Sequence, residues 1–140
     1  MPNNALPIDN KRTAATTPRV LVVDDNAVVR LALSGVIRQD LSLTLAGEAS
    51  NGESALEAIK TFQPDVVCLD IAMPRMDGLA TLRHLREADP QLRVIIITAR
   101  GTAEVVEEAR ALGADGFIVK PFNADRVLST IHNVLRSDQK

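Results

Sequence analysis

The chain has 140 residues, of which 46% are hydrophobic and 24% are charged, and its formal net charge is -2. This size and composition are typical of one soluble globular domain with a substantial core. The small net charge argues against a general nucleic-acid binder or a membrane-surface binder. The single cysteine, Cys68, excludes an internal disulfide framework and favours a reducing, cytoplasmic setting. The longest apolar runs are about five residues, too short for membrane insertion.

The chain begins with a polar segment, residues 1–18, which has no apolar period and is expected to be a flexible tail. From Arg19 onward, short apolar runs alternate with amphipathic stretches. Four runs are almost continuous and rich in β-branched residues, which is typical of strands covered on both faces. A further run, residues 43–46, alternates between apolar and polar residues as a half-exposed edge strand does. The four continuous runs are residues 20–23, 66–69, 94–97 and 117–119.

Between these runs, apolar residues recur at helical spacing and predict amphipathic helices. Strands that alternate with helices imply a parallel sheet with helices on both faces, and right-handed crossovers leave few topologies. We therefore expect an α/β fold with a five-stranded, doubly wound sheet in the order 2-1-3-4-5. Gly113 stands where a helix would end. The expected helix N-caps are Asn26, Asn51, Asp77, Thr102 and Asn123.

Polar residues whose side chains can bind ligands or react follow the predicted strands. Asp24 and Asp25 follow the first strand, Asp70 follows the third, Thr98 ends the fourth and Lys120 follows the fifth. The carboxyl ends of parallel strands share one edge, and ligands of doubly wound sheets bind where the strand order reverses. With the expected order, this reversal lies between the first and third strands, so the three aspartates should meet there.

Three neighbouring carboxylates need a compensating charge, because each one disfavours ionisation of the next. Oxygen ligands of this kind suit Mg²⁺, which binds through one or two carboxylates, waters and phosphate oxygens. Lys120 adds a point charge for a phosphate oxygen, and Thr98 adds a hydroxyl donor. The set therefore predicts a site where a phosphoryl group is placed on Asp70, with Mg²⁺ as the cofactor.

Each of these residues also has a simpler interpretation. Asp24 and Asp25 could form a turn and a helix cap, Thr98 could simply end a strand, and Lys120 could be a surface lysine. Only their register with Asp70 favours the functional interpretation. The two histidines, His84 and His132, lack the spacing of metal ligands and are expected on solvated helix faces.

Four segments at the ends of these strands match a known pattern. The chain resembles the receiver domain of bacterial two-component response regulators, which have a flavodoxin-like, CheY-like fold. The resemblance runs from Arg19 to about Leu135. The segments are V-V-D-D-N at residues 22–26, L-D-I-A-M-P-x-M-D-G at 69–78, I-T-A at 97–99 and G-A-D-G-F-I-V-K-P-F at 113–122.

The resemblance implies a role for each residue at the acidic end of the site. Asp70 matches the phosphoacceptor. Asp25 matches a direct Mg²⁺ ligand, and Asp24 matches its partner, which acts through water. Ala72 matches the position whose backbone carbonyl completes the metal site. The positions of Ala72 and Arg100 vary within the family and tune the lifetime of the phosphoryl group.

The resemblance also implies a switch. Thr98 matches the hydroxyl that moves toward the phosphate, and Lys120 matches the lysine that contacts it. The bond between Lys120 and Pro121 is expected to be cis. Phe117 matches an aromatic residue that changes rotamer, and the small Ala99 leaves room for its ring to turn inward.

On this basis we expect residues 19–137 to form a single receiver domain, followed by a short C-terminal end at residues 138–140. A histidine kinase or a histidine phosphotransfer protein would donate the phosphoryl group. The face formed by the fourth helix, fifth strand and fifth helix would then control a downstream effector protein. The resemblance implies a switch that assists its own phosphorylation and dephosphorylation, rather than an enzyme. It implies no direct nucleic-acid contact, and either a monomer or a phosphorylation-dependent dimer.

Other interpretations remain open. The segment at residues 45–56 is similar to receivers that precede helix-turn-helix domains, so the chain could be a fragment of a DNA-binding regulator. A haloacid-dehalogenase-type phosphatase would need a second aspartate where Ala72 stands. A flavodoxin would need a Gly-rich phosphate loop where Asp24 and Asp25 stand. The intact residue set argues against a degenerate module that works without phosphate.

Overall fold

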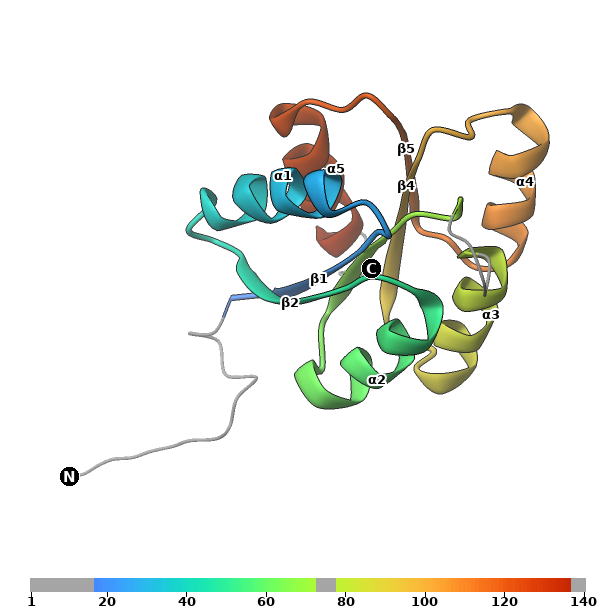
Figure 1. Cartoon of the computed structure of the whole chain (residues 1–140), viewed down its shortest axis with the longest axis horizontal. Coiled ribbons are helices and arrows are strands. Elements are labelled where there is room, and N and C mark those ends of the chain that lie inside the picture. The colour runs from blue at the N-terminus through green and yellow to red at the C-terminus, as the bar shows by residue number, and fades with distance from the viewer. Residues whose placement is uncertain (1–16, 73–77, 137–140) are drawn as a thin grey trace.

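The computed structural model describes residues 17–72 and 78–136 (Figure 1). Most of the expected tail, the expected N-cap Asp77 and the last four residues lie outside these ranges. Strands and helices alternate along the described chain. The strands are β1 (Arg19–Val23), β2 (Thr44–Ala49), β3 (Val66–Leu69), β4 (Arg93–Thr98) and β5 (Gly116–Val119). The helices are α1 (Ala27–Arg38), α2 (Gly52–Phe62), α3 (Gly78–Ala88), α4 (Ala103–Ala111) and α5 (Ala124–Arg136).

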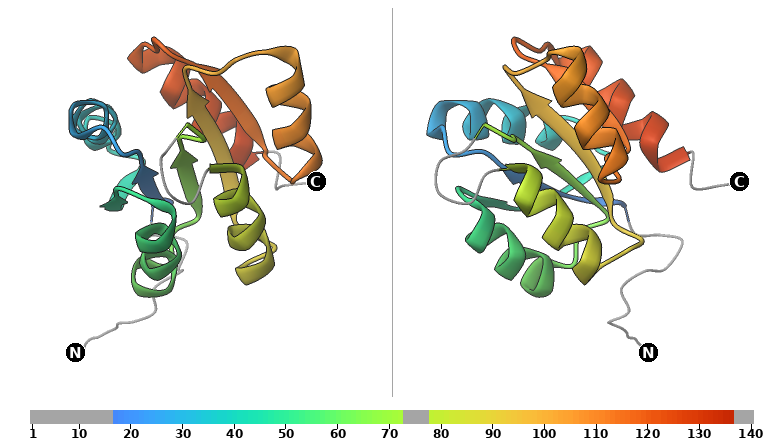
Figure 2. Two further views of the ribbon diagram at one scale, coloured as in Figure 1. Left: turned by 45° about the vertical axis from the view of Figure 1, so that its right-hand side comes forward. Right: turned by 90° about the vertical axis from the view of Figure 1, so that its right-hand side faces the viewer.

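The strands form one parallel sheet in the order β2-β1-β3-β4-β5, which confirms the predicted fold. Helices α1 and α5 cover one face of the sheet, and α2, α3 and α4 cover the other (Figures 1 and 2). The strand order reverses between β1 and β3. From β1 the chain crosses to β2 on one side, and from β3 it crosses to β4 on the other side. The site residues predicted to gather at the carboxyl edge therefore lie beside this reversal.

Two hydrophobic layers hold the sheet between the helices. Successive side chains of a strand point to opposite faces, so alternate residues of each central strand enter different layers. In β1, Leu21 and Val23 pack toward α2, α3 and α4, whereas Val20 and Val22 pack toward α1 and α5. This alternation explains why the central strands are apolar without interruption: both of their faces are buried.

Both edge strands depart from the prediction in detail. The predicted run ended at residue 46, but β2 continues to Ala49. The register of this strand shifts between Val20, which pairs with Leu45, and Leu21, which pairs with Gly47. A side chain at Gly47 would meet the Phe62 ring, because a Cβ there would lie 2.7 Å from it. β5 is not covered on both faces, since only Ile118 is buried and Val119 is 48% exposed.

The helix boundaries follow local hydrogen bonds. Asn26 accepts bonds from two amides in the first turn of α1, and Asn51 forms a reciprocal capping box with Ser54. Thr102 caps α4 through the amide of Val105. Gly113 follows α4 with a φ of 101°, a conformation that favours glycine. No helix within residues 17–72 and 78–136 is both long and apolar enough to span a bilayer.

Candidate functional site

The candidate site lies at the carboxyl edge of the sheet, at the ends of β1, β3, β4 and β5. Strand-like backbone bonds continue for one residue past three of these ends. The amide of Asp24 donates to the Ala49 carbonyl at 3.1 Å, and that of Asp70 donates to the Val23 carbonyl at 3.0 Å. The amide of Lys120 donates to the Thr98 carbonyl at 2.8 Å. The sheet itself therefore sets the backbone position of each of these residues.

Three carboxylates meet at this edge. Asp24, Asp25 and Asp70 each offer one carboxylate oxygen, and these oxygens lie within 4.8 Å of one another. Asp24 and Asp70 are 1% and 5% exposed, whereas Asp25 is exposed. Burial raises the pKa of Asp24, against the opposing effect of its hydrogen bond with Lys120. Three converging oxygen ligands, one of them open to solvent, fit a hard divalent cation such as Mg²⁺.

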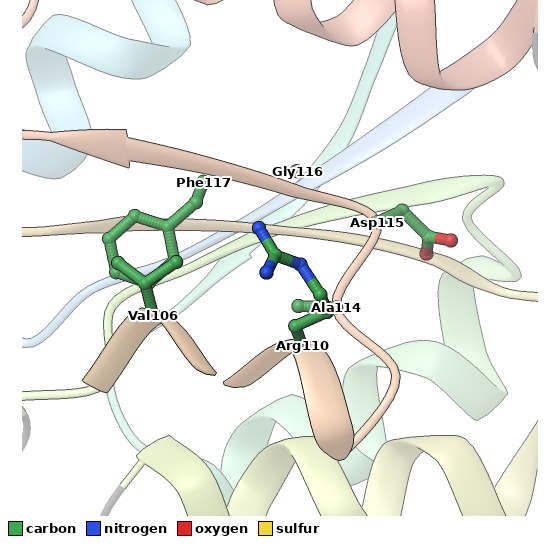
Figure 3. Close-up of a pocket in the computed structure, with 6 residues that line it drawn as sticks. All are labelled: Val106, Arg110, Ala114, Asp115, Gly116 and Phe117. Atoms are coloured by element: carbon green, nitrogen blue, oxygen red, sulfur yellow. The ribbon is translucent and has the colours of Figure 1, made fainter. Parts of the chain in front are cut away.

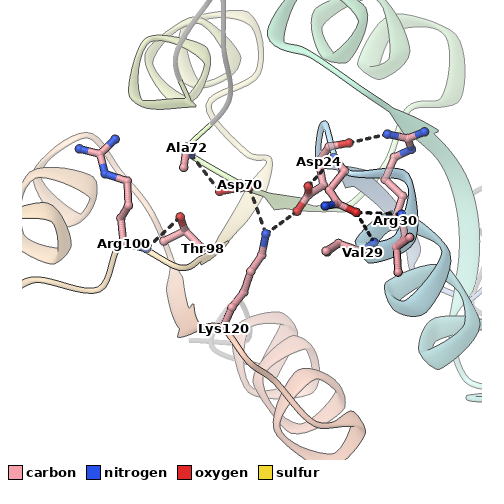
Figure 4. Close-up of polar contacts among 10 residues, drawn as sticks. Asp24, Val29, Arg30, Asp70, Ala72, Thr98, Arg100 and Lys120 are labelled. Carbon is pink, nitrogen blue, oxygen red and sulfur yellow. Dashed lines mark hydrogen bonds and ion pairs between the residues drawn. The ribbon is translucent and has the colours of Figure 1, made fainter.

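Lys120 reaches from the end of β5 to the two buried carboxylates. Its Nζ donates to Asp24 Oδ2 at 2.8 Å and to Asp70 Oδ2 at 3.1 Å (Figure 4). Burial favours a neutral lysine, but the hydrogen bonds to Asp24 and Asp70 outweigh burial and raise the pKa of Lys120. The ammonium group therefore stays charged at neutral pH and compensates for part of the negative charge.

The second oxygen of Asp70 has its own partner. The amide of Ala72 donates to Asp70 Oδ1 at 2.9 Å, so both carboxylate oxygens are oriented, one by an amide and one by Lys120. Thr98 is buried at the end of β4, and its hydroxyl oxygen accepts a bond from the Arg100 amide at 3.3 Å (Figure 4). The metal-ligand role of the Ala72 carbonyl stays a prediction.

The two residues of the predicted switch lie on neighbouring strands, since Thr98 ends β4 and Phe117 lies in β5. Phe117 is half-buried and packs against the layer beneath α2, α3 and α4. Beside it, between α4 and β5, lies a small hollow of about 90 Å³ (Figure 3). The Lys120–Pro121 peptide bond is cis. The residues that line the hollow are Val106, Arg110, Ala114, Asp115, Gly116 and Phe117.

Two residues at the site were missed by sequence reasoning. Gly78 stood in a matched segment without a role, yet a Cβ there would lie 2.0 Å from Ile71 Cα and 2.6 Å from the Asp70 carbonyl oxygen. Only glycine allows α3 to begin this close to the end of β3. Arg30 of α1 donates from Nη1 to the Asp24 carbonyl at 2.7 Å. The spacing of Asp24 and Arg30 offered no signal, because a helical arginine is usually a surface residue.

A parallel five-stranded sheet with three carboxylates and a lysine at its switch point defines a receiver-type α/β domain. The chain belongs to the response regulator receiver domain family, whose model matches residues 20–132. The relatives that it matches include chemotaxis proteins and a response regulator.

Two relatives and one solved structure illustrate this similarity. The chain is 41% identical over 117 residues to the chemotaxis protein CheY of Bacillus subtilis, covering 84% of this chain and 97% of that protein. It is 34% identical to the nitrate/nitrite response regulator NarL of Escherichia coli, covering 81% of this chain and 52% of NarL. A crystal structure of CheY from Borrelia burgdorferi, in a complex with CheX, BeF3 and Mg²⁺, superposes with a TM-score of 0.80 at 34% identity. That superposition covers 84% of this chain and 88% of the other.

Proposed function

We propose that this chain is a phosphorylation switch that accepts a phosphoryl group on Asp70 from a histidine kinase or a histidine phosphotransfer protein. One observation carries the proposal: the Lys120 ammonium bridges Asp24 and Asp70 beside a third carboxylate. A lysine and a cluster of carboxylates are the complementary charges that phosphoryl transfer to an aspartate requires. A purely structural ion pair would not need a third, exposed carboxylate at the same point.

The proposed reaction uses residues that are already oriented. An oxygen of the Asp70 carboxylate attacks the phosphorus of a phosphohistidine, the P–O bond forms, and the P–N bond breaks with its electron pair returning to the imidazole. Asp24, Asp25, Asp70 and the Ala72 carbonyl would hold Mg²⁺, which supplies positive charge beside the phosphoryl oxygens. Lys120 would turn from the carboxylates to a phosphoryl oxygen, so its charge is retained where new negative charge appears.

The structure also supports a route from the phosphate to the surface. A phosphoryl group adds about -1.5 to -2 charge at neutral pH. The Thr98 hydroxyl would leave the Arg100 amide and donate to a phosphoryl oxygen. Phe117 would turn inward and change the face made by α4, β5 and α5, which binds the effector protein. The hollow between α4 and β5 gives this segment room to rearrange.

The relatives support the same chemistry. The Borrelia burgdorferi CheY structure contains BeF3 and Mg²⁺ together with a protein partner, CheX. Transfer of these properties to this chain is our proposal, since it rests on the similarity of fold and on the acidic cluster.

A second candidate is a receiver that controls a DNA-binding domain. The match with NarL favours it, because the similar segment makes up 52% of that longer regulator. The match with CheY, at 97% of that protein, favours a receiver that acts through protein binding. The reading frame downstream of residue 140 in the source genome would distinguish the two candidates.

The proposal is tested by incubating the full chain with acetyl phosphate and Mg²⁺, and by measuring the intact mass of the products. Wild type should gain one phosphoryl group, and Asp70→Asn should gain none. Asp125→Asn, which changes an exposed aspartate of α5, is the matched control and should be phosphorylated like wild type. Equal phosphorylation of wild type and Asp70→Asn would exclude Asp70 as the acceptor.

A further inference from the structure

We propose that Arg30 is a positioning residue for the metal site. Arg30 forms an ion pair with Glu48 of β2. Its guanidinium fixes the peptide between Asp24 and Asp25 in the orientation that brings the Asp25 carboxylate to the site. This inference rests on the proposed function, because it concerns the same Mg²⁺ site.

A series of contacts connects the buried face of α1 with the loop that carries Asp24 and Asp25. Ser34 is buried, and its hydroxyl donates to Glu48 Oε2 at 2.7 Å. The other oxygen of that carboxylate, Glu48 Oε1, lies 3.5 Å from Arg30 Nε. The guanidinium then donates from Nη1 to the Asp24 carbonyl at 2.7 Å (Figure 4). Arg30 and Ser34 are one helical turn apart, so both reach the same glutamate.

Two consecutive residues of β2, Glu48 and Ala49, therefore fix the backbone of Asp24 at its carbonyl and its amide. Ala49 accepts the Asp24 amide directly at 3.1 Å, while Glu48 acts through Arg30 on the Asp24 carbonyl. The side chain of Asp24 is also fixed, because its Oδ1 accepts a bond from the Asn26 amide at 2.9 Å. With these contacts, the residue is constrained at its amide, its carbonyl and its carboxylate.

The constraint passes to Asp25 through the peptide bond. The peptide is planar, so the direction of the Asp24 carbonyl also sets the amide and the Cα of Asp25. Asp25 is exposed, and its carboxylate lies with those of Asp24 and Asp70 within 4.8 Å. Without the hold on the carbonyl, this peptide could rotate and carry the Asp25 carboxylate away from the other two.

The sign of the effect separates positioning from simple electrostatics. A guanidinium beside three carboxylates opposes a cation by its charge, so removing that charge alone would tighten Mg²⁺ binding. Removing a group that positions a ligand would weaken it, and the loss of such outer contacts typically costs about 10- to 100-fold in metal affinity. We therefore expect Arg30→Gln to weaken Mg²⁺ binding by about tenfold.

The experiment measures the Mg²⁺ dissociation constant of the full chain by isothermal titration calorimetry, without any phosphoryl donor. It compares wild type with Arg30→Gln and with Arg30→Lys, which keeps the charge but loses the fork of donors. Arg19→Gln is the matched control. Arg19 also donates to a backbone carbonyl, that of Phe62 at 2.9 and 3.0 Å, but at the opposite end of β1.

A pair of further measurements tests the mechanism. Glu48→Gln should weaken Mg²⁺ binding in the wild-type background but have little effect in Arg30→Gln, because the two residues act as one unit. The amide resonance of Asp25 should shift in both single variants before any metal is added. The free energy of unfolding, measured with urea, should fall in Arg30→Gln and in Arg19→Gln, but only the first variant should lose Mg²⁺ affinity.

The possible results separate a failure of the positioning role of Arg30 from a failure of the proposed function. Unchanged or tighter Mg²⁺ binding in Arg30→Gln, beside saturable binding in wild type, would overturn the positioning role and leave the proposed function intact. Equal losses in Arg30→Gln and Arg19→Gln would also overturn it, since they would show a general effect of stability. If Arg30→Gln does not fold, Arg30→Lys and Glu48→Gln decide the question in the same way. No Mg²⁺ binding by wild type would refute the proposed function and this inference together.

Discussion

Replacing Asp25 with asparagine should stabilise the metal-free protein, although it removes a predicted Mg²⁺ ligand. At the 4.8 Å limit for the ligand oxygens, two unit charges repel by about 0.9 kcal/mol at the dielectric constant of water and by about 3.5 kcal/mol at an effective value of about 20. Asp25 is exposed, so the smaller value applies to each of its two acidic neighbours. Lys120 offsets part of this repulsion, and we therefore expect a net gain of about 1 kcal/mol.

Urea denaturation followed by circular dichroism tests this prediction, since the chain has no tryptophan to report unfolding. In low salt without metal, Asp25→Asn should unfold at a higher urea concentration than wild type, and added salt should reduce the difference. With Mg²⁺ at about 100 times its dissociation constant, wild type should gain about 2.7 kcal/mol, and the variant should gain much less.

Asp115→Asn is a control of opposite sign. The Asp115 carboxylate lies 3.3 Å from Arg86 Nη2 and 3.6 Å from Arg93 Nη1, so its replacement should destabilise the protein. An Asp25→Asn variant that is less stable than wild type without metal would refute the reasoning. It would mean that Asp25 makes favourable contacts that outweigh its repulsion from Asp24 and Asp70.

Three further predictions concern Gly78, Lys120 and Asp40, a carboxylate outside the site. Gly78→Ala should destabilise the protein by about 1 to 3 kcal/mol, because its Cβ would lie 2.0 Å from Ile71 Cα; an unchanged urea midpoint would contradict this. Lys120→Met should cost about 3 to 5 kcal/mol without metal, because it leaves two buried carboxylates uncompensated, and calorimetric unfolding with and without Mg²⁺ measures the loss. The third concerns Asp40, where hydrogen bonds from Ser42 and then His132 lower the pKa from 3.8 to about 2. The stability that this carboxylate contributes is present above about pH 3.8 and is lost as the pH falls toward 2. Urea midpoints across this range should fall less steeply in Asp40→Asn than in wild type, and parallel curves would exclude the effect.

The environment of His132 shows where sequence reasoning stops. We expected a solvated histidine on the last helix, but His132 Nε2 lies 2.8 Å from Asp40 Oδ2, and its side chain is 35% exposed. His84, by contrast, is 49% exposed on α3, in agreement with the expectation. Nothing in the local pattern distinguishes the two residues, because the partner of His132 comes from a distant part of the chain.

The sequence by itself determined the order of strands and helices, the parallel sheet and the gathering of Asp24, Asp70 and Lys120 at one edge. These features follow from local periodicity and from the polarity of parallel strands, which are properties of short segments. The apolar runs therefore predicted both the fold and the place of the site.

Only the tertiary structure decided how the site is held. The bond from Arg30 to the Asp24 carbonyl, the bridge from Lys120 to two carboxylates and the close approach of Gly78 to Asp70 each join segments packed from different elements. Such contacts depend on the distances and rotamers that packing leaves available, and periodicity carries no information about either. The chemistry of the three carboxylates could therefore be predicted from residue types, whereas the contacts that orient them could be seen only in the folded chain.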